Sequence, residues 1–158
     1  MDPSPVVEES RTHMRSAVLS RALVIGTATV AALGGLAGVS SATPGTGVSA
    51  KLLFQKTVGD KDYVVREITI QPGGATGWHF HDGQLYGLVK SGTLTHYDHS
   101  CTVDGVYPAG APITEPSGAG NVHIGRNLGT APMVLQVLYV NPAGAPLSQD
   151  APAPACDR

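Results

Sequence analysis

The chain has 158 residues, a formal net charge of −2, and charged side chains at only 14% of its positions. This charge excludes the general basic surface of a nucleic-acid-binding protein, and a hydrophobic fraction of 42% is too high for a disordered chain. Two cysteines are too few for a four-cysteine zinc site. The 20 glycines and 12 prolines favour many turns and short strands over long helices.

The N-terminal part of the chain has the three features of a secretory signal peptide. Basic residues precede an apolar run over residues 22–39, and small residues follow as far as Ala42. Residues 1–13 are acidic and contain prolines, whereas Met14 begins a better signal, so we expect translation to start there. We expect cleavage after Ala42 and export of the mature chain. The alternative is an N-terminal membrane anchor, because the apolar run reaches the lower limit for a spanning helix.

Short apolar runs separated by turn residues begin at residue 51. The clearest covers residues 62–71 (DYVVREITIQ), whose partial alternation is typical of a half-buried strand. No segment between 51 and 140 has a helical period, and the number of short runs predicts an all-β fold, either a sandwich or a barrel. The other expected strands cover residues 51–57, 77–81, 85–89, 93–97, 102–108, 111–115, 123–127 and 133–140.

The chain on either side of this predicted barrel, residues 51–140, is rich in small and turn-forming residues. We expect residues 43–50 to form a linker and residues 141–158, rich in Pro and Ala, to be an extended tail. The two cysteines are Cys101 and Cys156. In an exported chain an even pair favours a disulfide, which would tether the tail to the barrel. Two free thiols are the alternative.

Histidines are the candidate metal ligands. His79 and His81 lie two residues apart on a predicted strand, so both side chains point to the same face. Two imidazoles from one strand, with a third ligand from elsewhere, are typical of a transition-metal site. The alternative is a pair of polar residues near a turn. We expect His96 and His99 to lie at the surface.

Two segments of the chain together resemble the paired motifs of the cupin superfamily. The first motif, G-x5-H-x-H-x3–4-E-x6-G, is matched at Gly73, His79, His81 and Gly92. The second, G-x5-P-x-G-x2-H-x3-N, is matched with two extra residues before the histidine, at Gly110, Pro116, Gly118, His123 and Asn127. The resemblance covers about residues 51–140 and is strongest to small exported single-domain cupins. It implies a jelly-roll β-barrel with an internal site.

The resemblance also implies a ligand set for one divalent transition metal, with Fe, Mn, Zn, Ni and Cu all open. The matching ligands are His79, His81 and His123. The glutamate of the first motif falls at Leu85, or at Tyr86 with the longer spacing, and neither side chain can replace a carboxylate. We therefore expect three imidazoles and no carboxylate, which still suffices for a divalent metal with open coordination positions.

Four further residues are candidates for the surroundings of the metal. Glu67 would enter the barrel as a base or as a supporting residue, and Asp82 would orient an imidazole. Gln84 is next to the missing glutamate, although one step along a strand turns it to the opposite face. Tyr86 would line the mouth of the barrel. For each residue the alternative is a solvent-facing, turn or packing role.

These observations leave two classes of function open. One is a metal-dependent enzyme of dioxygenase, isomerase or lyase type that acts on a small molecule. The other is a non-catalytic barrel that holds a small ligand or a metal, and a metal-free barrel is a further alternative. The missing glutamate favours binding, or an enzyme with three histidine ligands. We expect no nucleic-acid partner and no stable membrane span after signal cleavage, and we leave a homodimer open.

Overall fold

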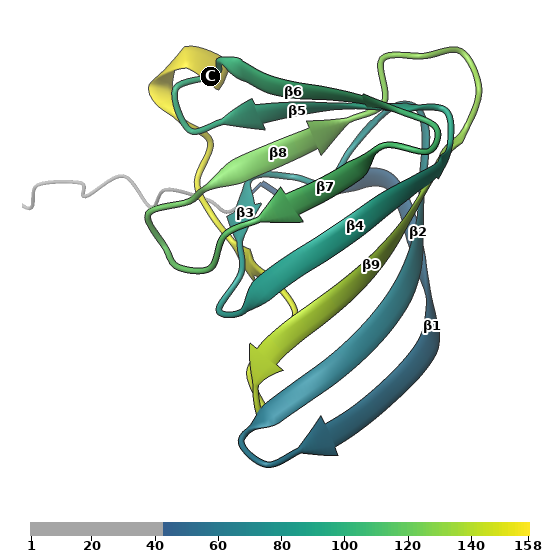
Figure 1. Ribbon diagram of the computed structural model, residues 1–158. Helices are drawn as coiled ribbons and strands as arrows, with labels where there is room; N and C mark the ends of the chain where they lie inside the picture. Colours follow the sequence, from purple (N-terminus) through teal and green to yellow (C-terminus); the bar gives the residue numbers. More distant parts are fainter. Residues whose placement is uncertain (1–42) are drawn as a thin grey trace, which may run out of the picture. The chain divides into compact units, whose positions relative to one another are not determined.

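Antiparallel strand pairing connects almost all of residues 43–158, which are the residues that the computed structural model describes (Figure 1). Within them lie ten strands and one short 3-10 helix, and no helix is both long and apolar enough to cross a membrane. The expected all-β barrel is confirmed. The elements are β1 (Thr46–Val58), β2 (Lys61–Ala75), β3 (His79–Phe80), β4 (Gln84–Ser91), β5 (Thr93–Asp98), β6 (Val103–Pro108), β7 (Pro112–Glu115), β8 (His123–Arg126), β9 (Met133–Pro142), β10 (Gln149–Asp150) and η1 (Ala155–Asp157).

The strands form two halves of a nearly closed barrel. The larger half has the order β1-β2-β9-β4-β7, and the smaller half contains β6-β5-β8-β3-β10. The end of β2 joins them, because Ala75 pairs with Arg126 of β8. In Figure 1 the smaller half lies across one end of the long curved strands of the larger half. Residues on the inner faces of both halves therefore meet in the barrel interior.

Alternation along β9 shows how the sequence determines the inner face of the larger half. Every second side chain from Met133 to Tyr139 is buried, and the residues between them are half-buried on the outer face. Met133 pairs with Ile70 of β2, and Tyr139 pairs with Val64. Burial of each such apolar side chain contributes about 1.5–3 kcal/mol. A slip of one residue would turn the whole apolar row to the outside, so the register is strongly specified.

Gly92 connects β4 to β5 in a conformation that the rest of the barrel requires. Its φ is 74°, in the left-handed region that favours glycine. A Cβ at this position would lie 2.7 Å from the Cβ of Met133, which is closer than packed carbons approach. The motif glycine at this position therefore lets β4 turn sharply against β9.

Both ends of the barrel extend beyond the expected bounds. β1 begins at Thr46, so most of the expected linker, residues 43–50, is strand. β9 continues to Pro142, and the tail that follows is extended at β10 but ends in the short helix η1. Strand pairing explains both differences, because β1 pairs along almost its whole length with β2 and β10 pairs with β3. The predicted signal peptide and the start at Met14 lie outside the described residues.

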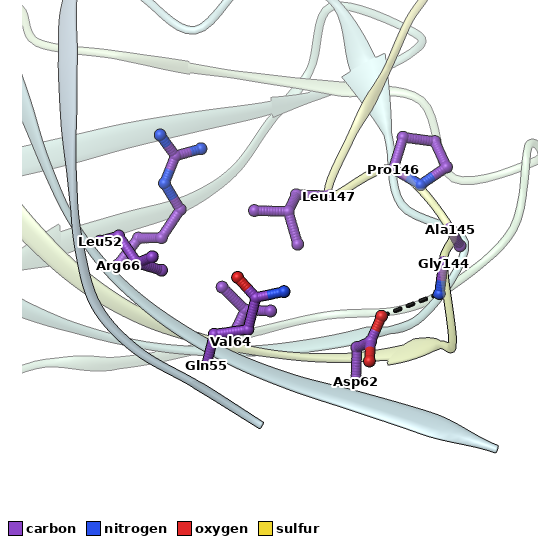
Figure 2. Close-up of a pocket in the computed structure, with 9 residues that line it drawn as sticks. All are labelled: Leu52, Gln55, Asp62, Val64, Arg66, Gly144, Ala145, Pro146 and Leu147. Carbon is purple, nitrogen blue, oxygen red and sulfur yellow. Dashed lines mark hydrogen bonds between the residues drawn. The ribbon is translucent and has the colours of Figure 1, made fainter. Parts of the chain in front are cut away.

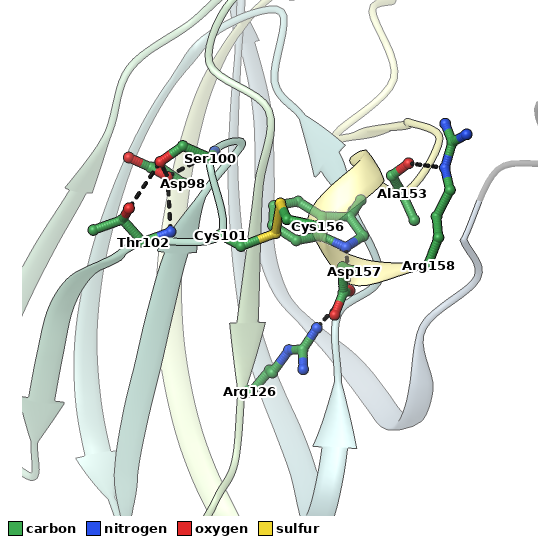
Figure 3. The surroundings of a disulfide bond; sticks show 10 residues. Asp98, Ser100, Cys101, Thr102, Arg126, Ala153, Cys156, Asp157 and Arg158 are labelled. Carbon is green, nitrogen blue, oxygen red and sulfur yellow. Dashed lines mark hydrogen bonds and ion pairs between the residues drawn. A yellow bond between two sulfur atoms is a disulfide. The ribbon is translucent and has the colours of Figure 1, made fainter.

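The C-terminal tail is attached to the barrel by a disulfide and by a buried tryptophan. Cys101 and Cys156 form the predicted disulfide (Figure 3). Trp78, which is fully buried, donates from Nε1 to Asp157 at 2.7 Å, and Arg126 donates to the same carboxylate at 2.6 Å. These contacts hold η1 against β8 and against the residue that precedes β3.

Replacement of both Cys101 and Cys156 by Ser should destabilise the protein by about 4 kcal/mol, because the disulfide closes a loop with a sequence separation of 55. Urea unfolding of the variant and of the wild type would measure the difference in the free energy of unfolding. Wild-type protein in a reducing agent is the control and should lose a similar amount. Equal unfolding midpoints for oxidised wild type and variant would contradict the prediction.

Candidate metal centre

Four side chains that can ligate a metal converge inside the barrel. One nitrogen or oxygen of each of His79, His81, Glu115 and His123 lies within 4.8 Å of the others. His79 and His123 are directly paired across β3 and β8. His81 directly follows β3, and Glu115 ends β7. Three of the four residues are buried and His79 is half-buried, so the cluster lies in the interior of the barrel.

Backbone carbonyls orient all three imidazoles of the cluster. Nδ1 of His79 lies 2.9 Å from the carbonyl oxygen of Gly77, and Nδ1 of His123 lies 2.8 Å from that of Asn121. Nδ1 of His81 lies 2.7 Å from the carbonyl oxygen of Leu147. Because a carbonyl only accepts, each Nδ1 carries a proton, and each Nε2 of the neutral ring is left with a lone pair. Metal-bound histidines typically have this arrangement.

Glu115 brings a negative charge against the imidazoles. Its Oε2 lies 2.9 Å from Nε2 of His81 and 3.2 Å from Nε2 of His123. The contact with His123 lacks hydrogen-bond geometry, so that buried Nε2 has no hydrogen-bond partner among the described residues. His81 has an acceptor at each nitrogen, but a neutral imidazole has only one proton to donate. A cation bound between the Nε2 atoms and Glu115 would satisfy these groups, so the donor set fits a metal ion.

Burial and the Glu115 charge set the protonation of the cluster. Burial, with a further contribution from His123, lowers the pKa of His79 from 6.5 to about 4. Burial acts to lower the pKa of His123 as well, but the Glu115 carboxylate outweighs it and raises that pKa. Burial acts to raise the pKa of Glu115, and its contacts with His123 and His81 outweigh that effect, so the carboxyl pKa is held far below its usual range. Glu115 is therefore ionised at neutral pH.

The expectation of a site without a carboxylate is wrong. Leu85, which replaces the motif glutamate on β4, pairs directly with Glu115 on β7. Directly opposed residues in an antiparallel pair point to the same face, and both side chains are buried. The carboxylate is thus present in the interior, supplied by the neighbouring strand. One sequence signal points to it, since Glu115 alternates with the buried Ile113, but the pairing with Leu85 could not be derived from the sequence.

The expectation that His96 lies at the surface is also wrong. His96 is buried on β5, and its Nδ1 lies 2.5 Å from Asp104. Its Nε2 lies 3.5 Å from the second carboxylate oxygen of Glu115 and has no hydrogen-bond partner among the described residues. The sequence indicates this burial only through alternation, because His96 lies two residues after Leu94 on the same strand face and Leu94 is apolar and buried. His99 is exposed in the turn after β5.

The other four candidates do not reach the imidazoles. Glu67 pairs with Gln136 on the outer face of the sheet, because the adjacent Ile68 lines the interior. Both carboxylate oxygens of Asp82 accept from Gln149 at 2.7 Å. The remaining two belong to β4, where Gln84 donates to the backbone carbonyl of Glu115 at 2.6 Å and Tyr86 is half exposed on the outer face.

A small cavity of about 30 Å3 lies beside the cluster. Its wall includes His79, His81 and Glu115 together with apolar side chains and Tyr139. This volume admits one or two water-sized molecules. Burial, and to a lesser degree the Glu115 charge, raise the pKa of Tyr139 to about 12, so the phenol is neutral at ordinary pH.

No protein-family model and no curated protein matches the sequence. Solved structures do match. The polyketide cyclase RemF from Streptomyces resistomycificus has a TM-score of 0.56 at 20% identity, over 69% of this chain and 75% of that one. A cupin-2 domain protein from Rhodospirillum rubrum has a TM-score of 0.55 at 17% identity, over 72% and 70%.

A third similar structure is an uncharacterised protein with a double-stranded β-helix domain from Klebsiella pneumoniae. Its TM-score is 0.51 at 25% identity, over 66% of this chain and 84% of that one. These likenesses, together with the nearly closed barrel, show that the chain has the fold of the cupin superfamily, as its two motifs imply.

In metal-free protein, His79 should remain neutral until the pH falls to about 4, because burial disfavours the imidazolium. His123 should instead protonate above pH 6.5, because the Glu115 carboxylate stabilises its cation. An NMR titration of the imidazole signals would measure both pKa values, and His79→Gln would assign the low one. Titration of His79 near pH 6.5 would contradict the buried geometry.

Proposed function

We propose that this chain, as a protein with the cupin fold, binds one divalent transition metal through His79, His81, Glu115 and His123 and acts on a small molecule. The observation that carries the proposal is the convergence of four ligand atoms of these residues within 4.8 Å. Three histidines and one carboxylate form a donor set that suits Fe, Mn, Zn, Ni and Cu. A metal bound by these residues would supply a Lewis acid with an open position for water, oxygen or substrate.

The small cavity beside the cluster favours oxygen chemistry over proton-transfer chemistry, whereas a separate pocket, of about 260 Å3, brings His96 next to His123. An isomerase or lyase needs a general base whose pKa lies near the working pH. The titratable residues around the small cavity are His79, His81, Glu115 and Tyr139, of which the first three are proposed ligands. The pKa of Tyr139, about 12, is too high for a base at neutral pH. On the side of the small cavity a metal-dependent oxygenase therefore fits best, and on the side of His123 the buried His96 is a candidate base for an isomerase or lyase.

A non-catalytic barrel is the second candidate, and the size of the cavity favours it. About 30 Å3 beside His79, His81 and Glu115 admits water or a diatomic molecule but no organic substrate, so such a substrate could approach only from the separate pocket of about 260 Å3 at His123. Oxygen uptake in the presence of small organic acids would distinguish the two candidates. Metal-loaded protein that consumes no oxygen and leaves the acids unchanged by NMR would support the binding module. For comparison, RemF, which has a similar fold, is named as an enzyme, a polyketide cyclase.

The disulfide indicates an oxidising, extracytoplasmic environment. We infer that the mature chain is exported after cleavage at Ala42. The inference is supported by the apolar run over residues 22–39, which basic residues precede and small residues follow.

Glu115→Gln should weaken metal binding at least about 10- to 100-fold, since loss of a ligand should exceed the effect of losing a supporting residue. Glu67→Gln is the matched control, because it removes the same charge from the outer face. Metal content by mass spectrometry and competition with a chromophoric chelator would measure the effect. Equal affinity of the two variants would contradict the assignment of Glu115.

Exchange of two paired residues offers a sharper test of the carboxylate's position. Glu115→Leu should weaken metal binding. The double variant Leu85→Glu/Glu115→Leu should bind the metal about 10-fold more tightly than Glu115→Leu, because residue 85 faces the same interior space. The control is Tyr86→Glu/Glu115→Leu, whose new carboxylate faces outward. Equal affinities of the two double variants, measured by chelator competition, would show that a carboxylate at residue 85 does not reach the metal, and an unchanged affinity of Glu115→Leu would show that Glu115 does not ligate.

A further inference from the structure

A second and larger cavity, of about 440 Å3, lies on the inner side of the larger half of the barrel (Figure 2). β1 and β2 form its floor, and the segment of residues 144–147 closes one side. In Figure 2 the side chains of Arg66 and Leu147 extend into the same space, with Val64 and Gln55 beneath them. The proposed ligand set lies elsewhere in the barrel and contributes no residue to this cavity.

This larger cavity adjoins the small cavity at the metal cluster. Arg66 pairs with Val137, and Val64 pairs with Tyr139. Val137 and Tyr139 line the small cavity, whereas their partners Arg66 and Val64 line the larger cavity. The two cavities therefore adjoin on one face of the sheet. The Tyr139 ring lies 5.7 Å from the His81 ring, and the carbonyl of Leu147, a residue that lines the larger cavity, accepts from His81. A molecule in the larger cavity would therefore rest against the same residues that support the metal ligands.

Arg66 is the unpaired charge of this cavity. Among residues 43–158 no side chain or carbonyl forms an ion pair or hydrogen bond with its guanidinium, although the residue is half-buried. The acid in the wall, Asp62, is already satisfied, because it accepts from the Thr57 hydroxyl at 2.5 Å and from the Gly144 amide at 2.8 Å. A half-buried guanidinium without a partner is a ready donor for an anion, and its planar fork matches a carboxylate.

The rest of the wall suits an apolar molecule with one negative charge. Leu52, Val64 and Leu147 present aliphatic surface toward the space around Arg66. Because Arg66 is the only cationic side chain that residues 43–158 contribute to the wall, the cavity matches a monoanion better than a doubly charged phosphate. Burial of aliphatic chain against such residues contributes about 25 cal/mol per Å2.

We propose that this cavity binds the carboxylate of a small, largely aliphatic organic acid, with Arg66 as the specificity-determining residue. This proposal names the class of molecule that is presented to the metal, and to that extent it rests on the proposed function. Arg66 donates two hydrogen bonds to the carboxylate, and Leu52, Val64 and Leu147 contact the chain. The other end of the molecule then points toward Tyr139 and Val137, the residues shared with the small cavity.

Octanoate and its neutral counterpart octanamide are suitable probes, since they differ in charge but hardly in shape. Isothermal titration of the full chain, with and without added metal, should show that octanoate binds more tightly than octanamide. Arg66→Gln should weaken octanoate binding about 10- to 100-fold and leave octanamide unchanged. Lys51→Gln is the matched control, because Lys51 pairs with the outward-facing Glu67 and the change in net charge is the same. This control should bind octanoate as the wild type does.

Two outcomes would overturn the proposal. One is equal binding of octanoate and octanamide, and the other is octanoate binding that Arg66→Gln leaves unchanged. A His79→Ala/His123→Ala variant separates this proposal from the metal site, because it keeps His81 and thus the hydrogen bond to Leu147 in the cavity wall. If it loses metal but keeps Arg66-dependent octanoate binding, the cavity assignment is supported independently of the metal. If the wild type binds no metal and still binds octanoate through Arg66, the proposed function fails and the carboxylate site stands.

Discussion

The buried negative charge of Glu115 is the constraint on which the interior of this barrel depends. An ionised carboxylate away from water is costly unless cationic or hydrogen-bonding groups compensate it. His81 and His123 approach one of its oxygens, and His96 approaches the other. Removal of any one partner would leave charge uncompensated, whereas a bound cation would satisfy the carboxylate and the imidazole lone pairs together. The geometry of the cluster is therefore that of a site built around positive charge.

The C-terminal tail is a structural part of this site. The carbonyl of Leu147 orients His81, and β10 pairs with β3, the strand that carries His79. The contacts of Asp157 with Trp78 and Arg126 and the disulfide hold the end of the tail. Residues 144–147 of the tail close one side of the cavity next to Arg66. Loosening the tail would thus disturb the histidine cluster and the proposed carboxylate site at the same time.

Strand register separates what could be predicted from what could not. The spacing of His79 and His81 and the two motifs indicated the imidazoles from local sequence alone. Glu115 was missed because its position opposite Leu85 depends on how β4 and β7 pair, and a pattern with a period of two does not reveal which strands are neighbours. A period of two also leaves open which of two adjacent residues faces inward: Glu67, a candidate for the interior with a solvent-facing alternative, points outward, and its neighbour Arg66 faces inward.

The sequence by itself determined the fold class, the disulfide partners and the histidines, because apolar alternation, turn residues and motif spacing are local properties of a chain. Only the tertiary structure decided which carboxylate joins the histidines, that His96 is buried, and that Arg66, which has no partner among residues 43–158, faces a cavity beside them. These facts depend on contacts between strands far apart in sequence. The low charge content of the chain now has a specific meaning, since two of its few charges, the buried Glu115 and the half-buried Arg66, face interior spaces where each must be paired or must bind a partner.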